Sequence, residues 1–171
     1  MQKILIAFSL CVLMVSPGFA QNVSPIVAEA VIEAPLKNVW EAWVTSEGLE
    51  RWLAPHAAID LRLNGLMRSN YNLNATLDDP STIENTIISF EPEKMLSIRV
   101  TKAPDNFPFP NAISEMWTVL YFEAVNTKQT KLRIVGLGFN LSDESQSMRK
   151  FFEQGNMTTL QQLQNYFSGQ N

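Results

Sequence analysis

The stretch 116-MWTVLYF-122, then 130-TKLRIVGLGF-139, then 143-DESQSMRKFFEQGNMTTLQQLQNYF-167 decides the fold expected for this chain. The first two segments are apolar and rich in β-branched and aromatic residues, which predicts two strands joined by a turn. In the third segment, apolar residues recur at helical spacing, which predicts one long amphipathic helix. These residues are Met148, Phe151, Phe152, Leu160, Leu163 and Phe167. A sheet followed by a closing helix indicates a grip with an apolar space between the two layers.

The segments before this end are expected to be mostly strands. We predict strands over 26–33, 57–64, 66–73, 82–90 and 95–101 from alternating apolar and polar residues between turn signals. Two short helices are expected after the first strand, one following Pro35 and one over 46–52. The resulting class is α+β, with a curved antiparallel sheet wrapped around the C-terminal helix. Gly136 and Gly138 are interpreted as points where helix and sheet backbones approach closely.

The first twenty residues have the layout of a secretory signal peptide. Lys3 gives a short positive segment, Ile4–Val15 is apolar, and Gly18-Phe19-Ala20 places small residues at a cleavage site before Gln21. The apolar run is shorter than the ~20 residues of a comfortable membrane span, although an uncleaved anchor is the alternative. We therefore expect a protein exported to the periplasm or secreted, with residues 21–171 forming one domain. The only cysteine, Cys11, lies in the signal segment.

The charge pattern and the residue inventory exclude several function classes. The formal net charge is −4 and no basic cluster occurs, so nucleic-acid binding is not expected. His56 is the only histidine and the expected mature chain has no cysteine, which excludes a two-histidine metal site and a Cys/His catalytic pair. No glycine-rich phosphate loop is present. We predict no metal and no cofactor, and no membrane span after cleavage.

The segments 33–43, 48–55, 59–65, 88–96, 107–119, 136–139 and 151–156 form an ordered set that covers nearly the whole mature sequence and resembles a known superfamily. It is similar to the SRPBCC proteins, also called START-like or helix-grip proteins, in the branch of the activator of the heat-shock chaperone ATPase. It also resembles exported bacterial members of unknown function. The resemblance implies the helix-grip fold and a cavity between the sheet and the long helix. It implies no particular reaction, because members range from lipid carriers to cyclases.

In this fold, aromatic residues from separate elements would lie near the cavity or its mouth. We predict a site for a small apolar or amphipathic ligand, with the loop Phe107–Pro110 over the mouth, although each aromatic taken singly also fits an ordinary core. The candidate ligand-binding residues are Trp52, Tyr71, Phe90, Phe107, Phe109, Glu115, Trp117 and Phe139.

Two other functions remain open at this stage. One is a cyclase- or hydrolase-like enzyme that pairs Glu115 with His56 or Tyr71. The other is a protein-interaction module that docks through its apolar loop. We expect a monomer or a homodimer, since both faces of the strand near 113–122 carry large apolar groups.

Overall fold

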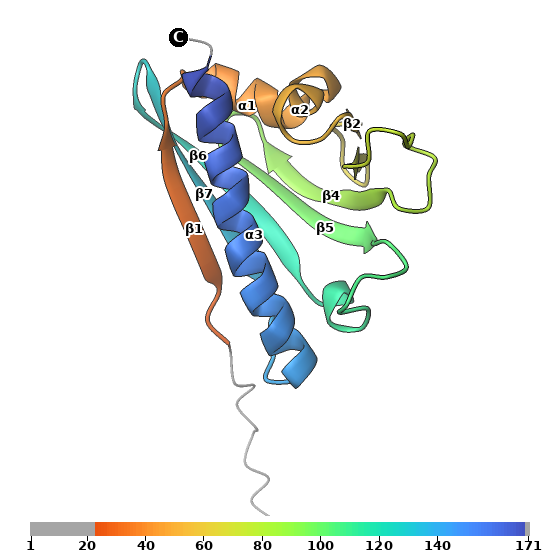
Figure 1. Cartoon of the computed structure of the whole chain (residues 1–171). Helices are drawn as coiled ribbons and strands as arrows, with labels where there is room; N and C mark the ends of the chain where they lie inside the picture. Colours follow the sequence, from red (N-terminus) through yellow and green to blue (C-terminus); the bar gives the residue numbers. More distant parts are fainter. Residues whose placement is uncertain (1–22, 170–171) are drawn as a thin grey trace, which may run out of the picture.

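The computed structural model describes residues 23–169, which form one curved seven-stranded antiparallel sheet and three α-helices. The expected signal peptide lies outside these residues. The strand order is β1-β7-β6-β5-β4-β3-β2, and the long helix α3 crosses one face of the sheet (Figure 1). The α+β helix-grip prediction is therefore confirmed. The elements are β1 (Ile26–Ile32), α1 (Leu36–Val44), α2 (Ser46–Trp52), β2 (His56–Ile59), β3 (Leu66–Asn70), β4 (Ile83–Glu91), β5 (Met95–Lys102), η1 (Ala112–Ser114), β6 (Trp117–Asn126), β7 (Gln129–Leu137) and α3 (Asp143–Ser168).

Local sequence signals explain where the helices begin. Pro35 immediately precedes α1, where a missing N–H costs nothing. The Thr45 hydroxyl accepts a hydrogen bond from the Gly48 N–H and caps α2. The Ser142 hydroxyl accepts from the Ser145 N–H at the start of α3, and Asp143 and Glu144 place negative charge at the positive end of the helix dipole.

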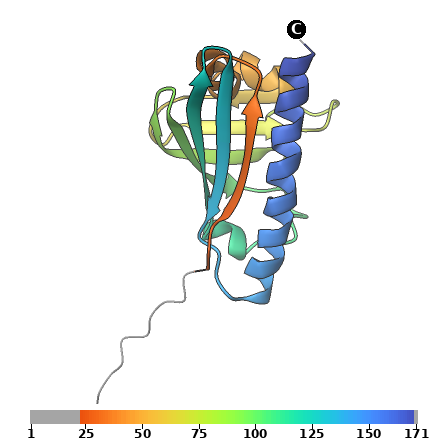
Figure 2. The same ribbon diagram turned by 90° about the vertical axis from the view of Figure 1, so that its left-hand side faces the viewer.

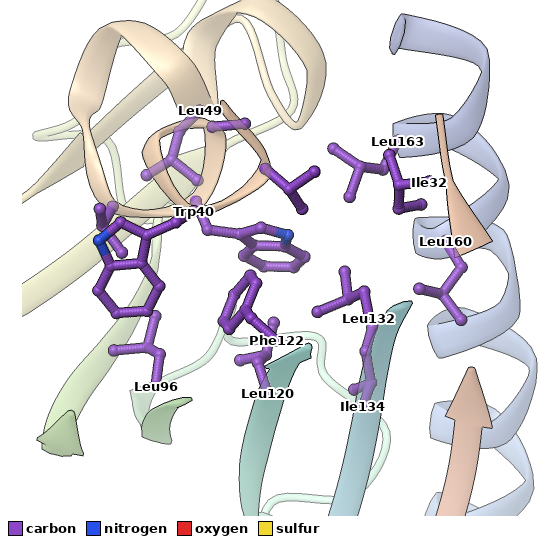
Figure 3. Close-up of a cluster of buried hydrophobic side chains, with 14 of the residues drawn as sticks. Ile32, Trp40, Leu49, Leu96, Leu120, Phe122, Leu132, Ile134, Leu160 and Leu163 are labelled. Atoms are coloured by element: carbon purple, nitrogen blue, oxygen red, sulfur yellow. The ribbon is translucent and has the colours of Figure 1, made fainter. Parts of the chain in front are cut away.

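The sheet twists strongly, so that its two ends run in different directions and enclose a concave face (Figure 2). The helix α3 lies over β1 and β7 at one side of that face. The main core joins α1, the β1–β7–β6 strands and the C-terminal half of α3, as Figure 3 shows for Trp40, Phe122, Leu132 and Leu163. A smaller buried cluster, which contains Ile26, Met116, Phe139 and Met148, lies at the other end of α3.

The predicted strands over 57–64 and 66–73 are both too long. β2 ends at Ile59 because the chain turns, with the Arg62 N–H donating to the Asp60 carbonyl and the Gly65 N–H donating to the Arg62 carbonyl. Asn64 takes a left-handed conformation with φ 60°, which no strand residue adopts. β3 ends at Asn70, and its predicted last residue, Leu73, is 78% exposed. In both segments apolar residues alternate as they do in a strand. Beyond Ile59 and beyond Asn70, however, the chain has no partner strand, so the alternation does not produce a longer strand.

Two expectations about the end of the chain are also wrong. Gly136 and Gly138 are indeed crowded, but by β1 and the η1–β6 connection and not by α3. A Cβ on Gly136 would lie 2.7 Å from Ile26, and one on Gly138 would lie 2.1 Å from the Glu115 carbonyl oxygen. Of the six apolar residues at helical spacing on α3, Phe151 is 51% exposed, and its ring contacts Phe107 and Phe109 of the loop before η1.

Candidate functional site

A cavity of about 290 Å³ lies between the concave face of the sheet and α3. The sheet supplies side chains from five strands, β3 to β7, and the middle of α3 supplies four more. The remaining lining residues come from α1, from the end of α2, from Tyr71 just after β3 and from the segment between β5 and the end of η1. The complete lining is Trp43, Leu53, Met67, Ser69, Tyr71, Ile83, Asn85, Ile98, Val100, Ala103, Pro104, Phe107, Ile113, Thr118, Leu120, Ile134, Phe151, Phe152, Asn156 and Thr159.

The lining is mainly apolar and carries no charged side chain. Strand alternation explains the inward set, since Met67, Ser69 and Tyr71 share one side of β3 and its extension. Partial burial raises the pKa of the Tyr71 phenol above 10.0, and the neighbouring Ser69 hydroxyl acts in the opposite direction. More than half of the Tyr71 side chain is nevertheless exposed, so this residue lies where the cavity meets solvent. The phenol is therefore neutral at pH 7 and can donate a hydrogen bond.

Four phenylalanines from the loop before η1 and from α3 form an aromatic cluster beside the cavity. Their rings meet edge to face, with centroids 5.5 Å apart for Phe107 and Phe109, and 5.9 Å apart for Phe107 and Phe151. Phe151 also contacts Phe109 at 5.8 Å and Phe152 at 5.5 Å. Phe151 is both exposed and a lining residue, which places the cluster at the mouth of the cavity.

The loop is fixed to α3 by one carboxylate. Glu144 accepts hydrogen bonds from the Asn111 N–H at 2.9 Å, the Ala112 N–H at 3.1 Å and the Asn111 amide at 3.1 Å. These bonds lower the pKa of Glu144 below 4.5, because they favour its charged form. The loop that carries Phe107 and Phe109 is thus held by hydrogen bonds to the first turn of the same helix that supplies Phe151 and Phe152.

The structure brings two of the eight predicted site residues, Tyr71 and Phe107, to the cavity wall. Phe109 lies one ring away from the wall, in the aromatic cluster. Trp52 lies behind Trp43, with centroids 4.8 Å apart, and its Nε1–H donates to the Ala42 carbonyl at 2.9 Å. Phe90 packs against the main core.

The three other predicted residues lie away from the cavity. Trp117 is on the outer face of β6, where the Arg99 guanidinium covers its ring at 6.0 Å. Phe139 is buried in the smaller core cluster. Glu115 is exposed, and its carboxylate accepts a hydrogen bond from the Asn140 amide at 2.6 Å. An acid–base pair in the cavity that uses Glu115 is therefore not assembled.

Several lining residues were not among the predicted site residues. Trp43, on the buried face of α1, lines the cavity, and its buried indole Nε1–H has no hydrogen-bond partner within residues 23–169. On α3, Asn156 and Thr159 interrupt the stripe of apolar residues between Phe152 and Leu163. Polar residues at two successive core-facing positions of a helix are a signal that marks this stretch from sequence.

Within residues 23–169, no group of three or more His, Cys, Asp and Glu side chains is placed to hold a metal ion. His56 lies on β2, and its Nε2 is 3.3 Å from the Leu73 carbonyl oxygen. No helix in the described part of the chain is long and apolar enough to cross a membrane.

Comparison with known families agrees with this geometry. The sequence profile of the family described as "Activator of Hsp90 ATPase homolog 1-like protein" matches residues 33–168. The chain belongs to this family. The Activator of Hsp90 ATPase homolog 1-like family is a branch of the SRPBCC superfamily, which confirms the resemblance noted from the sequence. Membership indicates a ligand-binding domain. No curated protein sequence matches the chain.

Solved structures with this family's fold resemble the chain over most of its length. The Aha1 dimer from Colwellia psychrerythraea matches with a TM-score of 0.65 and 14% identity, over 85% of this chain and 96% of that one. Protein MLL2253 from Mesorhizobium loti matches with a TM-score of 0.65 and 16% identity, over 86% and 99%. Protein SSP2350 from Staphylococcus saprophyticus gives 0.64 and 13%, over 85% and 92%. At these identities the likeness shows the fold.

Proposed function

We propose that this chain is an exported protein that holds a small apolar or amphipathic molecule in the cavity between the sheet and α3. The observation that carries the proposal is a cavity of about 290 Å³ with a largely apolar lining and a few polar side chains. Small-molecule sites have this character, and their volumes run from ~300 to 1,000 Å³. The cavity volume lies just below the lower end of that range, so the ligand is expected to be small.

The packing of α3 supports the same proposal. Its C-terminal half is anchored by Leu160, Leu163 and Phe167 in the main core, and its start is anchored by Met148 in the smaller cluster. Between these anchors the helix presents Phe152, Asn156 and Thr159 to the cavity. The helix is thus packed against the protein at both ends, with a cavity beneath its middle. A ligand-binding domain requires such a space, whereas a solidly packed core would leave none.

Export rests on the sequence of residues 1–20 and is part of the proposal. A signal peptide would deliver the mature chain to the periplasm or the exterior. The family name refers to a chaperone ATPase activator, and export would separate this chain from a cytosolic chaperone. Ligand binding therefore accounts for this chain better than chaperone activation.

The direct test is native mass spectrometry of the mature protein purified from its own cell envelope. A mass that exceeds the mature chain beginning at Gln21 by a small molecule, recovered by solvent extraction, would establish binding and identify the ligand class. A start at Met1 would contradict cleavage. Protein that stays free of ligand after envelope extracts have been added back would contradict the binding proposal.

A second candidate function is a protein-interaction module. It is favoured by two apolar side chains left exposed on α3, Phe151 of the aromatic cluster at 51% and Met157 at 61%. Replacing Phe107 and Phe109 with serine should release a protein partner that docks there. A complex from envelope extract that survives both substitutions would place the contact elsewhere.

The expected assembly state is a monomer or a homodimer. The solution structure from Colwellia psychrerythraea is of a dimer. In this chain, β1 and β6 expose Val27, Tyr121 and Val125 on the surface of the sheet. Sedimentation velocity of the mature chain between low and high micromolar concentration distinguishes the two states, and a larger assembly would contradict both.

A further inference from the structure

Three of the polar residues that line the cavity lie together on β3, its extension and β4, whereas Thr118 lies on β6 and Asn156 and Thr159 lie on α3. Met67 pairs with Asn85, and Ser69 pairs with Ile83, between β3 and β4. Side chains two residues apart on a strand point the same way, so Ser69 and Asn85 are diagonal neighbours on the concave face, and Tyr71 continues the row beyond the end of β3. We call these three residues the polar wall. All three line the cavity.

The polar wall has unused hydrogen-bonding capacity. Within residues 23–169, the amide of Asn85 makes no side-chain hydrogen bond, although the residue is only partly exposed. An amide carries two donors and an acceptor, and the Tyr71 phenol, whose oxygen interacts with the Ser69 hydroxyl, adds a donor. Asn156 supplies a second amide from α3, also without a side-chain partner in the described part of the chain. Polar groups in such a place are normally satisfied by water or by a ligand.

The cavity offers hydrogen bonds but no counter-ion. None of its twenty lining residues is Asp, Glu, Lys, Arg or His. An ionised group moved from water into this lining would lose its hydration and gain no opposite charge, which costs several times more than the burial of a neutral hydroxyl or carbonyl that finds a hydrogen bond. The lining therefore selects against carboxylates, phosphates and ammonium groups.

We propose that the ligand is a neutral amphipathic molecule, with a compact apolar body and an uncharged hydroxyl, carbonyl or amide group that bonds to Asn85 and Tyr71. This proposal rests on the proposed function, since it specifies what the same cavity accepts. It excludes free fatty acids and other anionic lipids in their ionised form. Specificity arises because the polar groups of the cavity are left without a hydrogen-bond partner when the ligand lacks a matching head group.

Three probes on one rigid frame test the proposal: naphthalene, 2-naphthol and 2-naphthoate, titrated into the mature protein at pH 7 by isothermal calorimetry. All three share an apolar two-ring body and differ in having no head group, a neutral head group or a charged one. The expected result is that 2-naphthol binds about two- to tenfold more tightly than naphthalene, the value of a net hydrogen bond. We expect 2-naphthoate to bind at least about thirtyfold more weakly than 2-naphthol.

Variants locate the effect on the polar wall. Asn85→Leu keeps the size of the side chain and removes the amide, and Tyr71→Phe removes only the hydroxyl. Each should reduce the preference for 2-naphthol over naphthalene to less than about twofold, so the ratio of the two affinities is the quantity to compare between variants. Asn38→Leu, at an exposed position on α1, is the control and should keep the preference. If Asn85→Leu fails to fold, Tyr71→Phe still tests the wall.

The outcomes separate the two proposals. Binding of naphthalene and 2-naphthol with equal affinity, tight binding of 2-naphthoate, or a preference that survives both variants would overturn the neutral head group and leave the cavity as a ligand site. Failure of all three probes to bind would overturn the proposed function itself.

Discussion

Alanine at two glycines near the C-terminal end should change the stability of the protein in opposite directions. Gly155 lies in the middle of α3, and a Cβ there would meet no atom within 4 Å. Alanine is favoured over glycine by about 1 kcal/mol in a helix interior, because glycine loses more backbone freedom on folding. Gly155→Ala should therefore raise the free energy of unfolding by about 1 kcal/mol. For a chain of this size that corresponds to about 2–4 °C in Tm.

Gly138→Ala should act in the other direction for two separate reasons. Gly138 has φ 84°, and an L-residue in that region costs about 1–2 kcal/mol. The new Cβ would also lie 2.1 Å from the Glu115 carbonyl oxygen, so backbone must move, at a further cost of about 1–3 kcal/mol. The expected loss is about 2–5 kcal/mol.

Thermal unfolding of the mature chain, followed by circular dichroism in one buffer, checks both signs. A lower Tm for Gly155→Ala would refute the reasoning, because it would mean that the middle of α3 needs glycine for a bend or a close contact. An unchanged Tm for Gly138→Ala would show that the β7 end is not held against Glu115.

Three further predictions concern Phe109 at the cavity mouth, the buried Leu163 of α3 and the hydrogen bonds of Glu144. Phe109→Ala should weaken 2-naphthol binding and lower the free energy of unfolding by about 1 kcal/mol only, since the ring is partly exposed; a large fall in Tm would make it a core residue instead. Leu163→Ala should cost about 2–5 kcal/mol in guanidinium unfolding because Leu163 is completely buried, whereas the exposed Gln161→Ala should cost almost nothing. The folded-state pKa of Glu144 is below 4.5, so its stabilising effect is complete above that pH and is lost as pH falls through the folded value. The Tm of the Glu144→Gln variant should therefore fall less between pH 6 and pH 3 than the Tm of the unchanged protein. The Tm of Glu50→Gln, a substitution at an exposed site, should fall as much as that of the unchanged protein.

Much of the fold could be predicted because local pattern and tertiary partner agree. The segment 143–167 has helical spacing and a Ser142 cap, and α3 runs from Asp143 to Ser168. The β6–β7 hairpin was predicted from two apolar runs for the same reason. The predicted strand over 57–64 failed because alternation specifies only one face of a chain segment, whereas a strand also needs a neighbour for its backbone groups. Beyond Ile59, those groups bond to a local turn and to Ile87, so the periodicity of Leu61 and Leu63 has no sheet to join.

The site was harder to predict because its residues depend on which face of each strand points inward. On β6 both faces carry large apolar residues, so aromatic character could not decide between Trp117 and its neighbours. The structure turns Thr118 and Leu120 toward the cavity, and Trp117 is compatible with the outer face because Arg99 covers it. Polar residues on the inward faces were a more informative signal than aromatic residues. Asn85, Asn156 and Thr159 are polar residues on faces that should be apolar, and each lines the cavity. In a grip fold, polar interruptions of the inward face locate the cavity better than its aromatics, because aromatics fill cores and outer faces alike, whereas a polar group turned inward requires a partner there.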